Sequence, residues 1–145
     1  MQFGYPVQFS RDRNGSVIAT FRDVPEAHTV GRNSAAAYKW AQDALVAALS
    51  LYVEDGRDVP KPSRPRRSER IVALPPMIAS KLAIYSAMRQ GGVTQLQLAS
   101  RLGSDARQVR RLLDLDHNST LPQLEAALAA LGKRLLVQVA DREAA

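Results

Sequence analysis

A segment rich in proline and arginine, residues 57–70, is the feature that most limits how this chain can fold. It holds three prolines and six basic residues and shows no hydrophobic periodicity, as is typical of a linker or an extended arm. Since the chain has only 145 residues, each side of this segment has room for one small domain, and a large multi-layer enzyme is excluded. We therefore expect two domains, 1–56 and 75–145, joined by a linker over 57–74.

The first domain begins with alternating apolar and polar residues, which is the period of a strand with one buried face. The alternation runs over Phe3–Phe9 and again over Val17–Phe21, and Asn14-Gly15 between them predicts a hairpin with a type I′ turn. A short third strand is expected over Ala27–Val30, and Arg70–Leu74 could return to the same sheet. The sheet is therefore predicted to contain three strands, or four if the chain returns.

A long helix is expected after the capping residue Asn33. Its apolar stripe lies at helical spacing, on Tyr38, Ala41, Leu45, Leu49 and Tyr52. Trp40 lies off this stripe, and we expect it to pack at the sheet edge or helix flank rather than against a partner. The first domain is therefore predicted as a βββα(β) unit of an α+β fold.

The second domain is expected to be mainly helical. Pro75-Pro76 can open a helix, because a proline in the first turn loses no intrahelical hydrogen bond. Three more helices are expected after the capping residues Thr94, Asp105 and Thr120. The tail, Leu135–Val139, is rich in β-forming residues and predicts a short final strand.

Residues 94–112 carry the most specific pattern in the chain. Two short helices that cross steeply need a small residue where they touch and, in the turn, a residue that tolerates positive φ. Ala99 and Gly103 stand at these two places. The apolar residues of both helices then form one buried seam, made of Leu98, Leu102, Val109 and Leu112. This spacing predicts a helix-turn-helix, a motif that binds DNA.

The outer face of the second of these helices carries long hydrogen-bond donors. If Val109 and Leu112 face the core, the residues that face outward are Arg107, Gln108, Arg110 and Arg111. Arginine pairs with guanine and glutamine with adenine in the major groove, so we predict that these residues bind DNA. Gln95 is placed for a backbone phosphate, and Ser104 in the turn completes the predicted DNA-binding set. The alternative is that these side chains form an ordinary solvent-exposed helix face. That alternative does not explain why the buried apolar seam occurs at the spacing of a helix-turn-helix.

Charge and composition narrow the function further. The net charge is +6, yet the first 56 residues hold five basic and six acidic groups, so the positive charge lies in the linker and second domain. Such a region fits a nucleic-acid partner, although a basic linker is also simply well solvated.

The chain has no cysteine, and we expect neither a cofactor nor a metal. Without a signal peptide or an apolar span, we expect a cytoplasmic protein without membrane contacts.

Two resemblances carry these interpretations further. Residues 94–131 resemble the Cro and phage-repressor class of helix-turn-helix domains, with Ser104 where an apolar residue is common. Almost the whole chain resembles the HicB-type antitoxins, on the opening Tyr5-Pro6-Val7, the run Asp23–Gly31 and the helix end Leu51–Gly56.

The HicB resemblance implies a function for each domain. The first domain would be a reduced RNase H-like fold that masks HicA, a small RNA-cleaving toxin (an mRNA interferase). The second would repress the toxin-antitoxin operon by binding operator DNA as a homodimer or tetramer, associated with the nucleoid. The carboxylates of Asp43, Glu54 and Asp55 complement a basic RNA-binding surface, so we predict that they face the toxin.

Two other functions fit these residues less well. Metal-dependent hydrolysis needs several carboxylates around two ions, whereas the acidic residues of the first domain fall on a turn, a strand end and one helix. We therefore expect no enzyme activity. The alternative is a stand-alone helix-turn-helix regulator whose first domain senses a different protein or a small ligand, but one sheet and one helix leave little room for a ligand pocket.

Overall fold

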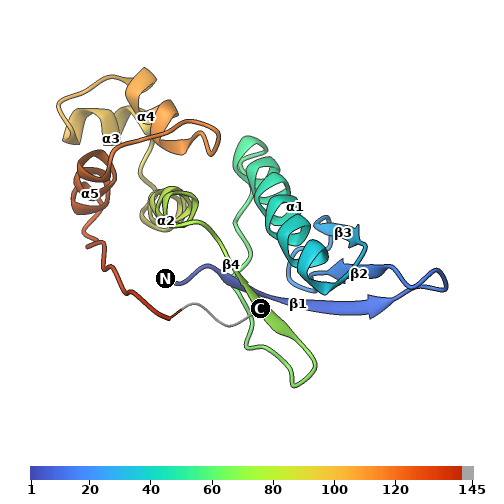
Figure 1. The fold of residues 1–145 in the computed structure, drawn as a ribbon. Coiled ribbons are helices and arrows are strands. Elements are labelled where there is room, and N and C mark those ends of the chain that lie inside the picture. Colours follow the sequence, from blue (N-terminus) through green and yellow to red (C-terminus); the bar gives the residue numbers. More distant parts are fainter. Residues whose placement is uncertain (142–145) are drawn as a thin grey trace. The chain divides into compact units, whose positions relative to one another are not determined.

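The computed structural model describes residues 1–141 as an α+β protein with two compact units, which divide between Ala79 and Ser80. The first unit is an antiparallel sheet with one long helix, and the second contains four helices (Figure 1). No helix in residues 1–141 is long and apolar enough to cross a membrane.

The sheet of the first unit has four strands in the order β3-β2-β1-β4. They are β1 (Gly4–Arg11), β2 (Val17–Thr20), β3 (His28–Gly31) and β4 (Arg70–Ala73). The first half of β1 pairs with β4 and its second half pairs with β2, and every pairing is antiparallel. The predicted third strand and the return of the chain as a fourth strand are both confirmed.

The hairpin between β1 and β2 lies where it was predicted, but the turn type was wrong. A type I′ turn needs positive φ at both central residues, and Gly15 has φ +79° whereas the φ of Asn14 is not positive. The Gly15 N–H instead donates to the Asp12 carbonyl, and Asp12 Oδ1 accepts from the N–H groups of Asn14 and Ser16. The Asp12 side chain therefore closes a longer loop that needs only one left-handed residue.

Helix α1 (Ser34–Glu54) covers one face of the sheet (Figure 1). It begins at Asn33, whose Oδ1 accepts from the Ala36 N–H at 2.9 Å, as the sequence predicted. The buried side of α1 is made of Ala37, Ala41, Leu45, Ala48, Leu49 and Tyr52. The facing strands bury Tyr5, Val7, Val17, Ala19 and Val72. This apolar layer is the core of the first unit.

The second unit contains most of α2 (Pro76–Gly91), whose first four residues belong to the first unit, together with α3 (Gln95–Arg101), α4 (Ala106–Leu113) and α5 (Leu121–Ala130). Thr94 and Thr120 form the capping boxes that begin α3 and α5, each with a glutamine three residues later. These starts agree with the sequence prediction, because capping is a local property of the chain.

The predicted final strand, Leu135–Val139, is wrong: residues 133–141 form no helix or strand. A strand needs a neighbour to pair its backbone groups, and the strands of the described residues all belong to the sheet of the first unit. Leu136, Val137 and Val139 are consequently exposed.

Residues 57–69, which we name the strap, form no helix or strand, turn at Arg67-Ser68 and are fastened to the rest of the first unit along their length. At its start, the Tyr5 hydroxyl donates to the Pro60 carbonyl at 2.7 Å. The Arg57 guanidinium lies 3.9 Å from the Tyr52 ring centroid and pairs with Glu26 at 3.3 Å. The composition that suggested a flexible linker therefore belongs to a segment that is bound to the sheet and to the end of α1.

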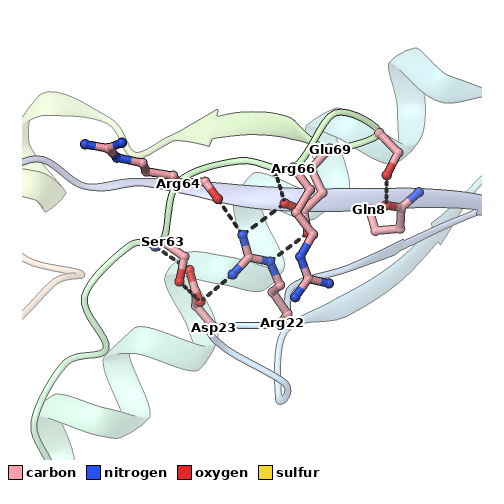
Figure 2. A network of polar contacts seen from close by, with 8 residues as sticks. Gln8, Arg22, Asp23, Ser63, Arg64, Arg66 and Glu69 are labelled. Carbon is pink, nitrogen blue, oxygen red and sulfur yellow. Dashed lines mark hydrogen bonds and ion pairs between the residues drawn. The ribbon is translucent and has the colours of Figure 1, made fainter.

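The second part of the strap is held by a polar network around Arg22 (Figure 2). The Arg22 guanidinium binds both carboxylate oxygens of Glu69, at 2.8 and 3.1 Å, and donates to the Arg64 carbonyl at 2.6 Å. Asp23 beside it accepts from the backbone N–H and the hydroxyl of Ser63, at 2.8 and 2.7 Å. Bidentate and charge-assisted contacts of this kind fix geometry better than single neutral hydrogen bonds do.

The strap predicts a specific acid sensitivity. The hydrogen bond from Arg22 lowers the pKa of Glu69 below its ordinary value of 4.5. A carboxyl group whose pKa is lowered in the fold stabilises it above the unfolded pKa, and this contribution is lost as the pH falls through the folded pKa. We expect the free energy of unfolding of the first unit to fall below pH 4.5, and Glu69→Gln to remove part of this pH dependence.

Urea unfolding at a series of pH values measures this effect, with the fluorescence of Trp40, the chain's one tryptophan, reporting on the first unit. Glu125→Gln, at an exposed position of α5, is the control and should leave the pH dependence of the first unit unchanged. An identical pH dependence in wild type and Glu69→Gln would contradict the role given to the Arg22–Glu69 pair.

Candidate functional site

Helices α3 and α4 are joined by a four-residue turn, residues 102–105. Gly103 has φ +61° within this turn, a backbone conformation that residues with a Cβ rarely adopt. The Ser104 N–H donates to the Ala99 carbonyl at 2.9 Å, which closes the end of α3. The Asp105 side chain then accepts from the Gln108 N–H at 2.9 Å and begins α4. These four residues thus end α3 and begin α4, and no further residues lie between the two helices.

The two helices pack through small and branched apolar residues. Leu98 and Ala99 of α3 are buried, as are Val109 and Leu112 of α4, whereas Leu102 is half-buried. The small side chain of Ala99 lets the two helices approach closely. The buried seam expected from the sequence is therefore present, with Leu102 at its margin.

The polar side of this pair contains the residues that the sequence singled out for DNA. Arg107, Gln108 and Arg110 are exposed on α4, and Arg111 is half-buried near its end. Gln95 is exposed at the first position of α3, and Ser104 is exposed in the turn. Because Val109 and Leu112 hold the opposite side of α4 in the core, the structure presents a cluster of cationic and amide donors to solvent.

Lys81 of α2 makes a structural contact that the sequence reasoning missed. Its side chain is 0% exposed, and its ammonium donates to the carbonyls of Arg111 and Asp114, at 2.7 and 2.9 Å. These carbonyls lie at the end of α4, where a helix has acceptors without intrahelical donors and where its dipole favours a cation. Lys81 therefore ties the end of α4 to α2.

Two features of the surroundings of Lys81 have opposite effects on the pKa of its ammonium group. Burial lowers the pKa of the Lys81 ammonium, and the nearby Asp114 carboxylate opposes this shift. In the sequence, Lys81 stands among the apolar residues of α2 with nothing to distinguish it from a solvated lysine. The partner carbonyls are 30 and 33 residues away along the chain, so no local pattern could have identified the contact.

The three carboxylates predicted to face a toxin lie on or beside α1. Asp43 and Glu54 are exposed and lie on the same side of the helix, three turns apart, while Asp55 is exposed at its C-cap. The structure does not bring them into one cluster, so they offer a row of separate negative charges rather than a single binding centre.

Two further acidic residues of the first unit, Asp12 and Asp23, hold parts of the fold together. Asp12 closes the hairpin and Asp23 holds Ser63, so these two side chains serve the fold. In residues 1–141 no group of three or more histidines, aspartates or glutamates could hold a metal ion.

The chain is similar to known proteins of one family. The model of a family described as "HicB_like antitoxin of bacterial toxin-antitoxin system" matches residues 4–83, which include the sheet, α1 and the strap. Antitoxin HicB 2 of Photorhabdus laumondii is 38% identical over 131 residues, covering 90% of this chain and 92% of that protein.

Two further relatives extend the similarity over both units. Antitoxin HicB of Escherichia coli K12 is 35% identical, covering 90% of this chain and 95% of its own length. Antitoxin HicB of Pseudomonas fluorescens Pf0-1 is 34% identical and covers 96% and 95%. The chain belongs to the HicB-like antitoxin family.

The Lys81 contact predicts that its loss destabilises the second unit. Lys81→Met keeps the aliphatic stem but leaves two carbonyls at the end of α4 without their donor. Because an unsatisfied buried acceptor costs free energy, we expect the free energy of unfolding to fall by about 1 to 3 kcal/mol. Chemical denaturation followed by far-ultraviolet circular dichroism measures the change.

Arg101→Met provides a matched control. The Arg101 side chain also donates to a carbonyl, that of Ala130 at 3.1 Å, but it does so at an exposed site. Its loss should change the free energy of unfolding by no more than about 0.5 kcal/mol. If the two variants were equally stable, Lys81 would not have the structural role described here.

Proposed function

We propose that this protein is an antitoxin that binds and masks an RNA-cleaving HicA-type toxin and represses its own operon by binding operator DNA. Membership of the HicB-like family carries the first part of the proposal, since the family match covers the sheet, α1 and the strap. We assign toxin masking to this first unit and regard it as a reduced RNase H-like fold, on the basis of its β3-β2-β1 order followed by a helix.

Masking is proposed to occur without catalysis by the antitoxin. The aspartates of the first unit that lie nearest the strands, Asp12 and Asp23, are engaged in holding the fold. An antitoxin of this kind acts by covering a surface, for which affinity and shape suffice. The family membership also favours this function over a stand-alone regulator with a ligand-sensing domain.

Operator binding is proposed for the second unit, with α3 and α4 as a Cro-like helix-turn-helix. The support is the exposure of Arg107, Gln108 and Arg110 on one side of α4 while Val109 and Leu112 are buried on the other. A recognition helix needs long donors that reach base edges and a seam that fixes its orientation. Gln95 and Ser104, exposed at α3 and in the turn, are proposed to contact the phosphate backbone.

Repression is proposed to require a homodimer or tetramer, which acts in the cytoplasm at the nucleoid. One helix-turn-helix makes few base contacts, and proteins of this class bind as dimers on half-sites about 34 Å apart. The exposed apolar tail, with Leu136, Val137 and Val139, supports this proposal because pairing with the tail of a second copy would bury it.

Toxin neutralisation tests the main proposal. Expression of a HicA-type toxin with the full chain should restore growth of the host, whereas toxin with an empty vector should not. The fragment of residues 1–79, which contains the whole first unit, should also restore growth. Continued growth arrest with the full chain present and folded would refute the antitoxin function, and arrest with the fragment alone would show that masking needs the second unit.

The DNA-reading residues can be tested one at a time. Replacing Arg107, Arg110 or Arg111 by alanine should weaken binding to the operator by about 1 to 3 kcal/mol wherever that arginine reads a base. Gln95→Ala should instead weaken binding to operator and random DNA alike. Salt titrations of both DNAs measure these effects, and an unchanged specific-to-random ratio in all three arginine variants would refute the recognition-helix assignment.

Assembly through the tail has a separate test. Deletion of residues 133–145 should convert the dimer to a monomer and weaken operator binding, because each half-site would then be bound alone. Sedimentation velocity measures the oligomeric state. A deletion variant that stays dimeric would show that the subunits associate elsewhere.

A further inference from the structure

Helix α1 is apolar on more than the side that it packs on the sheet. Its buried residues, such as Ala41, Leu45 and Leu49, account for that side. A second apolar line runs along the solvent side of the helix and consists of Trp40, Ala44, Ala47 and Leu51, which we name the outer stripe. The spacings of four, three and four residues place these side chains above one another on one face of the helix.

The outer stripe is open to solvent at both of its large residues. Trp40 is 51% exposed and Leu51 is 52% exposed, Ala47 is exposed, and Ala44 is half-buried. The packing expected for Trp40 at the sheet edge or helix flank covers at most half of the residue. Its recorded ring contact is with the Lys39 ammonium, 5.9 Å from the ring centroid, and this contact leaves half of the side chain uncovered.

An exposed tryptophan in line with an exposed leucine is unusual for a surface that stays in water. Tryptophan is highly buried on average, and contiguous exposed apolar patches mark interaction sites. Tryptophan is also among the residues that contribute most to binding at the centre of protein interfaces. The outer stripe therefore has the composition of an interface centre.

The charges beside the stripe indicate what kind of partner fits. Asp43 follows Trp40 by three residues and Glu54 follows Leu51 by three residues, so a carboxylate stands next to each large apolar residue, and the Lys39 ammonium lies beside Trp40 as well. These carboxylates repel DNA, and a second copy of the stripe would bring like charges to the contact. A protein with an apolar patch bordered by lysines or arginines complements both features.

We propose that the outer stripe of α1 is the surface on which the toxin docks, with Trp40 and Leu51 as its apolar anchors and Asp43 and Glu54 as its charged border. This inference rests on the proposed antitoxin function and specifies where the toxin binds. A toxin that cleaves RNA must hold a polyanion, so it has the cationic groups that this border requires. Occupying them with carboxylates would compete directly with RNA.

The test measures the affinity of the full-length protein for a catalytically inactive HicA-type toxin by calorimetry. Trp40→Ala combined with Leu51→Ala should weaken binding by roughly 30-fold or more, as expected for loss of interface anchors. Asp43→Lys combined with Glu54→Lys should weaken binding and reduce the dependence of the affinity on salt. Val30→Ala is the matched control, because Val30 is 54% exposed on β3 of the same unit and should leave the affinity unchanged.

Each outcome decides between the inference and its alternatives. Thermal unfolding and operator binding of the variants should match wild type, which separates loss of the surface from loss of the fold. If wild type binds the toxin and the stripe variants bind equally well, or if Val30→Ala alone weakens binding, the toxin docks elsewhere.

If the stripe variants change the oligomeric state without toxin, a second copy is the occupant. If wild type itself does not bind any HicA-type toxin, the proposed function fails together with this surface.

Discussion

The first unit depends on the return of the chain to β1 after α1 is complete. Tyr5 and Val7 in the first half of β1 are fully buried, and β4 is the strand that pairs with this half. The strap makes this return possible by crossing from the end of α1 to β4 while its polar groups are bound by Arg22, Asp23 and Tyr5. Without these contacts, an extended segment rich in proline and arginine would remain a solvated linker.

In the second unit, too, a side chain from elsewhere in the chain holds one short segment in place. Its helices are short, and a helix such as α4 (Ala106–Leu113) gains its stability from packing rather than from its own propensity. The buried seam fixes one side of α4, and Lys81 fixes its end through two carbonyls. In both units, therefore, a buried apolar layer sets the architecture and a few charged or polar side chains hold one further segment in place.

The sequence predicted the elements that are determined locally and missed those determined by distant contacts. Asn33, Thr94 and Thr120 begin helices as expected, because each needs only a side chain and the next three residues. The type I′ turn was wrong because the Asp12 side chain favours another loop, and the final strand was wrong because strand formation requires a neighbour. Lys81 and the fastening of the strap are tertiary contacts with no sequence pattern. The helical spacing placed Trp40 off the buried stripe but did not give the extent of its exposure.

The pairing of β1 with β4 also has a consequence for biosynthesis. Gly4 pairs with Ala73, so almost the entire first unit must leave the ribosome before its first strand can find its last neighbour. Contacts between residues far apart in sequence form slowly, since the intervening chain must be ordered first. During translation, the backbone groups of the first half of β1 therefore stay without their β4 partners until Arg70–Ala73 have been made, and an antitoxin chain cut short before β4 would lack one side of its sheet.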